Sequence, residues 1–424
     1  MSWLPQNPKV ADSILRTLRT DYERLSVTGW PAAPAAFVLD QYGIDLRTEY
    51  AGIEVPNPFG KGSGQLSMTA RQVAEDVEAG LGFVVLKTVI AEDDRGERTM
   101  QAWAIREARM VVEPIVGRSG ETGWTVTWKG RGWWLSFDDY LQLIREARQL
   151  AAGTGTLIVP SCKYHLPSPE EHDWKVSEYE STTRRLLDAW HEQESDVARL
   201  TNTPMPIEKD FSPTLAGSDR SSARDRILEW LRETPALIRR FVPDGSVRVG
   251  LKLFNALFDD EFQLEMLRAV ETSDGTHRPD FHVYGNRLFD PHREFEGHRG
   301  VAYGGPDLSN RNLRVMERLA AEFPPATALP WSATGNITTG RMAIEYALRG
   351  ASTFQLHTFF QLPAAHYRMA VGNRSQKALF ELLLHPETGL VVWMHHLANA
   401  RGLPRSPLTF RSIVGLGPDT CVAS

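Results

Sequence analysis

A repeated alternation of short apolar runs with longer amphipathic stretches constrains the fold of this chain more than any other feature of its sequence. Apolar runs rich in β-branched residues are typical of buried strands, and apolar positions that recur every three or four residues are typical of helices. Predicted strands occupy residues 57–63, 83–88, 156–162, 205–212, 247–254, 281–286, 328–334 and 353–358. Predicted helices occupy residues 69–79, 137–152, 178–191, 224–241, 261–270, 308–323, 339–348 and 375–384. Eight parallel strands that each precede a helix form a closed (β/α)8 barrel, so we predict this α/β TIM barrel and keep an open doubly wound sheet as the alternative.

Three segments lie outside this alternation. Residues 1–50 predict an N-terminal helical extension, and the segment 44–55 is expected to form a hairpin against the closed end of the barrel. Residues 108–134 lie within the barrel region 51–390 and contain two β-like runs around a turn, which predicts an inserted β-hairpin. Residues 391–424 predict a C-terminal helical tail, with His395 and His396 on a helix surface.

The overall composition excludes several classes of protein. The 424 residues include 47 Lys and Arg and 53 Asp and Glu, which gives a net charge of −6, and 42% of them are hydrophobic. A large globular core is therefore expected, and wholesale binding of nucleic acid is not, because it needs a basic surface. Cys162 and Cys421 provide no disulfide framework, and no apolar run approaches the roughly 20 residues of a membrane helix. We expect a cytoplasmic protein with no membrane or nucleic-acid partner.

Polar residues stand at the ends of the predicted strands. The active site of a barrel lies at the C-terminal ends of its strands, so these residues are expected to share one site. Lys87 and Lys252 each end an otherwise apolar strand, where an ammonium group loses hydration unless an electron-rich group meets it. These lysines indicate either a bound anionic ligand or an internal ion pair with a carboxylate, and the sequence leaves both interpretations open.

The last two predicted strands lead into loops that contain glycine. The segment 335–340 reads Gly-Asn-Ile-Thr-Thr-Gly and runs into a helix, and Gly350 precedes the final strand. Loops after strands 7 and 8 of a barrel, together with a helix N-terminus, frequently bind phosphate through backbone N–H groups. The same short motif is also an ordinary turn with a helix cap, and its position in the barrel favours the phosphate interpretation.

Taken in chain order, these residues resemble the FMN-dependent dihydroorotate dehydrogenases and the related flavin domain of the dihydropyrimidine dehydrogenases. The resemblance extends over residues 52–358. The segments that carry it are Gly52, Asn57-Pro58, Gly62-Ser63-Gly64, the strand 80–88 ending in Lys87-Thr88, the strand 249–253 with Lys252, Asn286, Gly304-Gly305, the segment 335–340, Gly350-Ala351-Ser352 and Thr358.

The resemblance implies FMN as the cofactor. It implies that Gly335, Asn336 and the residues around Thr358 hold the phosphate, and that the ring lies near Lys87, Thr88 and Lys252, where a cation stabilises the reduced ring. The remaining residues that it assigns to the cofactor are Ser63, Gly64, Asn286, Gly304, Gly305 and His357.

The family also carries a Cys or Ser base in a segment of strand 4 that precedes a proline. The corresponding stretch here is 208–214, which makes Ser212 the candidate for proton transfer and Lys209 the group that would lower the pKa of its hydroxyl. An equally acceptable interpretation is that Ser212 caps a turn before Pro213. Cys162 is a second candidate nucleophile, although it ends strand 3 rather than strand 4.

The resemblance implies an oxidoreductase that interconverts a C–C single and double bond beside a carbonyl group, in a pyrimidine or related heterocycle. Asp210 and Asn286 are then the candidate substrate contacts, and an external electron donor or acceptor is required. Asp210 stands where the family has an asparagine, and a carboxylate would repel an anionic substrate such as orotate. Assembly as a homodimer is left open.

Three alternatives belong to other functional classes. A lyase or aldolase barrel would form a Schiff base between Lys87 or Lys252 and a phosphorylated carbonyl substrate. A barrel without activity would retain binding alone. A metal enzyme is disfavoured, because the candidate ligands show no regular spacing and lie in a polar loop region. These candidate ligands are His277, His282, His292 and His298.

Overall fold

Ten short strands pair in parallel to form one curled sheet, in the order β6-β10-β11-β12-β13-β16-β17-β4-β5-β9. The computed structural model describes residues 2–106, 110–128, 132–168, 170–192, 203–211, 223–255, 259–295 and 297–418. The strands of the sheet are β4 (Phe59–Lys61), β5 (Phe83–Val85), β6 (Val89–Ile90), β9 (Leu157–Val159), β10 (Ser161–Lys163), β11 (Met205–Asp210), β12 (Val247–Phe254), β13 (Phe281–Asn286), β16 (Trp331–Thr334) and β17 (Ala351–Leu356). Each predicted strand region overlaps at least one of them, so the predicted α/β fold with a parallel sheet is confirmed, and the sheet is compatible with a TIM-type arrangement.

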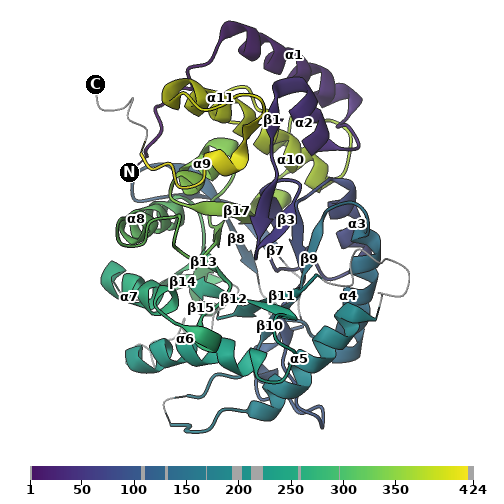
Figure 1. Cartoon of the computed structure of the whole chain (residues 1–424), viewed down its shortest axis with the longest axis vertical. Coiled ribbons are helices and arrows are strands. Elements are labelled where there is room, and N and C mark those ends of the chain that lie inside the picture. Colours follow the sequence, from purple (N-terminus) through teal and green to yellow (C-terminus); the bar gives the residue numbers. More distant parts are fainter. Residues whose placement is uncertain are drawn as a thin grey trace.

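Helices cover the outside of this sheet, as Figure 1 shows. They are α3 (Ala70–Glu78), α4 (Phe137–Ala151), α5 (Val176–His191), α6 (Arg224–Arg239), α7 (Asp260–Glu271), α8 (Pro306–Glu322), α9 (Gly340–Leu348) and α10 (Arg374–Leu384). Consecutive helices from α3 to α8 contact one another, and α10 contacts both α9 and α3. Side chains of Thr69, Ser136, Asp259, Thr339 and Asn373 cap helix N-termini, which fixes where those helices begin. All eight predicted helices are present.

An aromatic cluster fills one end of the curled sheet. The antiparallel hairpin of β2 (Thr48–Tyr50) and β3 (Ile53–Val55) lies in the segment where a hairpin was predicted. Its Tyr50 ring lies 4.4 Å from the ring of Phe83 and 5.1 Å from that of Phe281, measured between centroids. Gly60 and Gly250 make room for these rings, because a Cβ at either position would lie 2.5 Å or less from Phe83 or Phe281. Because these rings fill this end of the sheet, a cavity is expected at the opposite end of the strands.

The N-terminal extension and the C-terminal region lie side by side at one end of the molecule (Figure 1). The N-terminal extension contains α1 (Asp12–Thr28) and α2 (Pro34–Tyr42), and the C-terminal region contains α11 (Leu390–Arg401). Strand β1 (Ile44–Asp45) pairs in parallel with β18 (Leu408–Thr409) and joins the two regions. The predicted surface position of His395 and His396 is wrong, because both are buried and Nδ1 of His396 accepts a hydrogen bond from the backbone of Lys9.

Two antiparallel hairpins stand at the carboxyl ends of the parallel strands. The hairpin of β7 (Met110–Val116) and β8 (Thr122–Trp128) lies in the predicted insertion. The hairpin of β14 (Leu288–Phe295) and β15 (His298–Tyr303) was not predicted, and it replaces the expected polar loop. Arg293 pairs with Glu113 at 3.1 Å and Gly304 N donates to Thr125 Oγ1 at 3.0 Å, so the hairpins are tied together.

Short 3-10 turns complete the described structure, and none of its helices has the length and apolarity needed to cross a membrane. These turns are η1 (Gln101–Trp103), η4 (Gly275–His277), η5 (Thr358–Gln361), η6 (Ala364–His366) and η7 (Phe410–Ser412).

Candidate functional site

A cavity of about 710 Å³ lies at the carboxyl ends of the parallel strands. This is the end of the sheet at which the sequence predicted the site, and the volume is typical of a site for a cofactor or substrate. Most of the candidate residues line it: Ser63, Lys87, Thr88, Asp210, Lys252, Asn286, Gly304, Gly305, Gly335, Asn336, His357 and Thr358. Gly64 lies just behind the wall, where a Cβ would be 2.1 Å from Nε2 of His357.

Two of the candidate catalytic residues do not line the cavity. Along β11, Glu208 and Asp210 share one face and Lys209 takes the other, because side chains alternate along a strand. The Lys209 ammonium donates to the carbonyl of Tyr164 at 3.0 Å, and burial lowers its pKa to about 8. Cys162, opposite Lys209 in the neighbouring strand, is fully buried, which raises the pKa of its thiol above the usual range. Ser212 lies outside the described residues.

Lys87 brings an unneutralised cation to the cavity wall. Its side chain is 5% exposed and lines the cavity, and among the described residues its ammonium makes no hydrogen bond or ion pair. Burial lowers the pKa of Lys87 to about 8, while the charge of Asp210 raises it and that of Lys252 lowers it further. A buried ammonium of this kind is stabilised by an anion or an electron-rich ligand in the cavity.

Lys252 has a different environment from Lys87. Its ammonium donates to Oε1 of Gln355 at 3.2 Å and lies 3.8 Å from Oε2 of Glu208. Tyr50 and Gln355 donate to the other oxygen of Glu208. Burial raises the pKa of this carboxyl, against the charge of Lys252, which lowers it. Of the two interpretations of a strand-end lysine, the internal ion pair therefore describes Lys252.

Three hydroxyl groups and a carboxylate form a connected cluster at the same wall. Oγ1 of Thr88 lies 2.9 Å from Oγ of Ser63 and 3.0 Å from Oγ of Ser161. The Thr88 hydroxyl also donates to Oδ2 of Asp210 at 3.1 Å. Ser63, Thr88 and Asp210 line the cavity, whereas Ser161 does not.

The loop after β16 presents backbone donors to the cavity. Gly335 and Asn336 have φ angles of +113° and +54°, and a Cβ on Gly335 would lie 2.9 Å from Leu308 and Asn312, so only glycine fits there. In the described structure, no backbone hydrogen bond uses the N–H groups of residues 336, 337 and 338, all of which line the cavity. Such a loop is suited to bind an anion.

The helix that follows this loop contributes less than the sequence suggested. The N-terminus of α9 packs against α11, since a Cβ on Gly340 would lie 2.0 Å from the backbone nitrogen of Leu390. Arg341 N already donates to the carbonyl of Thr388 at 2.8 Å. The helix that begins at the cavity is α8, whose first residues follow the cavity-lining Gly304 and Gly305.

The histidine of the last strand closes the cavity wall. Burial lowers the pKa of His357 well below its usual value, and the charges of Lys87 and Arg287 lower it further. Nδ1 of this ring lies 2.9 Å from Nε2 of Gln361. His357 is therefore a neutral, polar part of the wall.

The hairpins and the loop before them form an apolar roof over the cavity. The roof residues are Trp103, Ile105, Trp124, Leu288, Phe289, Phe295 and Val301. Arg287 is half-buried beneath this roof, where its guanidinium donates to the carbonyl of Val126 and desolvation lowers its pKa to about 9. Sequence reasoning missed Arg287, Asn255 and Gln355, all of which line the cavity. Their positions at or just after strand ends were the available signal.

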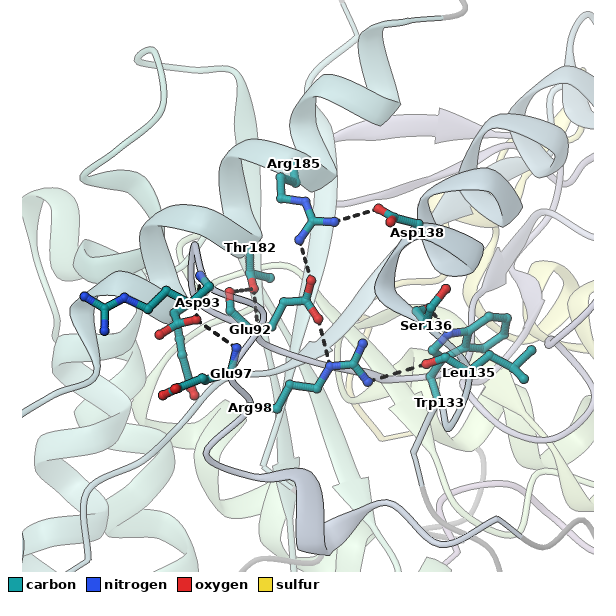
Figure 2. A network of polar contacts seen from close by, with 12 residues as sticks. Glu92, Asp93, Glu97, Arg98, Trp133, Leu135, Ser136, Asp138, Thr182 and Arg185 are labelled. Carbon is teal, nitrogen blue, oxygen red and sulfur yellow. Dashed lines mark hydrogen bonds and ion pairs between the residues drawn. The ribbon is translucent and has the colours of Figure 1, made fainter.

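A network of ion pairs anchors the loop that carries Trp103. Figure 2 shows the Glu92 carboxylate between the guanidinium groups of Arg98 and Arg185. Arg98 Nε lies 2.8 Å from Glu92 Oε2, and Arg185 also pairs with Asp138 at the start of α4 at 2.7 Å. Glu92 N and the side chain of Thr182 on α5 are joined at 2.9 Å. The loop is thus fixed to both α4 and α5.

In the part of the chain that the structure describes, no group of three or more His, Cys, Asp or Glu side chains is placed to hold a metal ion. His282 is on β13, His292 on β14 and His298 on β15, rather than in one loop.

Comparison of the chain with protein-family models and with curated proteins gives no match. Functional assignment therefore depends on the geometry of the cavity.

Proposed function

We propose that this protein is an FMN-dependent oxidoreductase on an eightfold α/β barrel, similar to the dihydroorotate dehydrogenases. The barrel part of the proposal treats β5 with β6, and β9 with β10, as two interrupted strands. Hydrogen bonding continues beside both interruptions, from Leu86 N to Val159 O at 2.9 Å and from Glu208 N to Pro160 O at 3.0 Å. Because β17 also pairs with β4, eight strands would then close on themselves.

One observation carries the proposal for FMN: a buried cation without a partner among the described residues shares a cavity with unused backbone donors. The Lys87 ammonium would meet electron-rich atoms of the ring, and the N–H groups of residues 336–338 would donate to the phosphate. The apolar roof suits a flat aromatic ring. These features fit the size and the charge distribution of FMN.

In this proposal each wall of the cavity has a separate task. FMN, when bound, supplies hydride transfer. Lys87, Lys252 and Asn286 bind the edges of the ring, with Ser63, Gly64 and Thr88 beside them, and the roof excludes water. The phosphate wall comprises Gly304, Gly305, Gly335, Asn336, His357 and Thr358.

The proposed reaction interconverts a C–C single and double bond beside a carbonyl group, in a pyrimidine or related heterocycle. An external donor or acceptor exchanges the electrons. The carboxylate of Asp210 in the cavity favours a neutral ring with N–H groups over an anionic substrate. Ser212 stays the sequence-derived candidate for proton transfer.

Titration of the cofactor-free protein with FMN, followed by the change in flavin fluorescence, tests the proposal. We expect one FMN per chain. Lys87→Met should weaken binding by about tenfold or more, because a charge-assisted hydrogen bond contributes roughly 1.5–3 kcal/mol. Lys9→Met, which changes an exposed lysine, is the matched control and should bind as the wild type does. Absence of FMN binding by the wild-type protein would refute the proposal.

A second candidate function rests on the same lysine. A buried lysine whose pKa is lowered to about 8 has a larger fraction of nucleophilic amine at neutral pH, as a Schiff-base lyase or aldolase requires. Reduction with borohydride in the presence of glyceraldehyde 3-phosphate would attach the sugar covalently to Lys87 if this function holds. Mass spectrometry of the labelled peptide distinguishes the two candidates, since FMN binding leaves no covalent adduct.

A further inference from the structure

The hydrogen bonds around Thr88 have only one consistent direction. A hydroxyl group donates one hydrogen bond and accepts up to two. Thr88 has three partners, and it donates its single proton to Oδ2 of Asp210, because an ionised carboxylate only accepts. The hydroxyls of Ser63, at 2.9 Å, and of Ser161, at 3.0 Å, must therefore both donate to Oγ1 of Thr88. Protons are thus ordered from Ser63 through Thr88 to Asp210.

Among the cavity-lining members of this cluster, Ser63 is the most exposed. Ser63 is partly exposed and lines the cavity, whereas Thr88 is 3% and Asp210 is 8% exposed. Because the Ser63 proton points to Thr88, the lone pairs of its oxygen are available to the cavity. Ser63 Oγ is therefore placed to accept a proton, and its own proton has a path to a carboxylate.

A cation lines the same cavity as this proton acceptor. Lys87 precedes Thr88 in the chain, lines the same cavity and has an ammonium without a hydrogen-bond or ion-pair partner among the described residues. A carbonyl oxygen that gains negative charge when a neighbouring C–H bond breaks would be stabilised by such a group. The wall thus combines a hydrogen-bonded chain that ends at a carboxylate with a buried ammonium group.

We propose that Ser63, Thr88 and Asp210 form a proton relay, which removes the proton from the carbon next to a carbonyl group of the substrate. The C–H bond breaks and its electron pair forms an enolate, whose oxygen faces Lys87. Ser63 Oγ takes the proton, the Ser63 proton moves to Thr88, and the Thr88 proton moves to Asp210, which becomes a neutral acid. The inference deepens the proposed function and depends on it for the substrate class, and it replaces Ser212 as the first proton acceptor.

Exchange of hydrogen for deuterium tests the relay without any hydride transfer. The protein as isolated is incubated in D2O with 5,6-dihydrouracil or succinimide, and the loss of the proton signal next to the carbonyl is followed by NMR. We expect catalysed exchange by the wild type and a fall of about a hundredfold or more in Ser63→Ala, Thr88→Val and Asp210→Asn. Thr88→Ser keeps the hydroxyl and should retain most of the rate. Circular dichroism and thermal unfolding check that each variant is folded.

Ser161→Ala is the matched control for packing, because Ser161 donates to the same Thr88 oxygen from outside the cavity. We expect its exchange rate to stay within about threefold of the wild type. The proposal is overturned if the wild type catalyses no exchange with either probe. It is also overturned if Ser161→Ala lowers the exchange rate as much as Thr88→Val does, or if Ser212→Ala abolishes exchange while Ser63→Ala does not.

The FMN titration is interpreted separately from the exchange experiment. Exchange without FMN binding would refute the proposed function alone, and FMN binding without exchange would refute the relay alone.

Discussion

At the scale of single residues, Lys87 shows how burial changes both stability and chemistry. Its pKa of about 8 in the folded protein lies below the ordinary value of 10.5, chiefly because burial disfavours the charged form. The folded state therefore releases this proton at lower pH than the unfolded state does. Below pH 8 both states carry it, and the folded state bears the full cost of burying the charge.

Lys87→Met should make this cost measurable. Between pH 8 and 10.5 the unfolded state binds the proton more tightly, so the free energy of unfolding of the wild type rises relative to the variant. At pH 7 the variant, which buries no charge at this position, has the larger free energy of unfolding. From pH 7 to pH 9 we expect this difference in the free energy of unfolding to narrow by roughly 1 kcal/mol. Urea unfolding of the FMN-free proteins at several pH values measures it, and parallel curves would contradict the assigned environment of Lys87.

At the scale of elements, the loop that carries Trp103 is held by charges rather than by secondary structure. Glu92 is 6% exposed and pairs with two arginines, one from its own loop and one from α5 (Figure 2). Glu178 on α5 adds a hydrogen bond from the backbone of Thr99 at 2.6 Å. Loops of this kind open locally at a free-energy cost set by such contacts.

Glu92→Ala should therefore loosen this loop without unfolding the sheet. We expect trypsin to cleave after Arg95 or Arg98 about tenfold faster than in the wild type, which corresponds to about 1.4 kcal/mol of lost local stability. Asp138→Asn is the control, because Asp138 is 85% exposed and meets only the outer edge of Arg185. Equal cleavage rates in Glu92→Ala and the wild type would show that the ion pairs do not hold the loop.

The elements also show what the sequence could predict. Strand and helix periodicity identified each helix from α3 to α10 and every strand of the sheet except β6, which lies just past the predicted segment 83–88. Burial on both faces leaves the apolar runs that mark such strands. Strand β14 contains a proline and four polar or charged residues between Phe289 and Phe295, so this segment was taken for a loop. His395 was misplaced because α11 is apolar almost all round, and burial overrides the usual exposure of histidine.

The strand-end residues of the candidate site were predictable from the sequence, but the contacts between them and the roof above them were not. Residues at strand ends were identified, since topology alone brings them together. The partner of Lys252 was not, because Glu208 lies on the neighbouring strand β11, and the sequence does not give the register that brings the two side chains within 3.8 Å. The roof was not predicted either, because several of its residues belong to the β14–β15 hairpin, which the sequence analysis took for a loop.

At the scale of the whole molecule, one buried network connects distant parts of the chain. Tyr50 from the β2–β3 hairpin, Glu208 from β11, Lys252 from β12 and Gln355 from β17 meet inside the curled sheet. The Glu208 carboxylate at its centre is 0% exposed. A buried charge that loses its partner typically costs 3–5 kcal/mol.

Lys252→Met should lower the free energy of unfolding by about 3 kcal/mol, because it leaves the Glu208 carboxylate without its cation. Lys252→Met combined with Glu208→Gln should recover most of this loss, since a neutral amide still accepts the hydrogen bond from Tyr50. Urea unfolding of the wild type, both single variants and the double variant gives the coupling energy. A double variant no more stable than Lys252→Met would contradict the ion pair.

The ion pair from Arg293 to Glu113, at 3.1 Å, holds together the two hairpins that form the roof of the cavity. Trp124 of one hairpin and Phe289 of the other both line the roof, so we expect a flat ring bound beneath them to leave faster when the two hairpins separate. Residence time would then be governed by the protein's own opening rate, and salt, which screens the ion pair, would shorten it even for a ligand without charge.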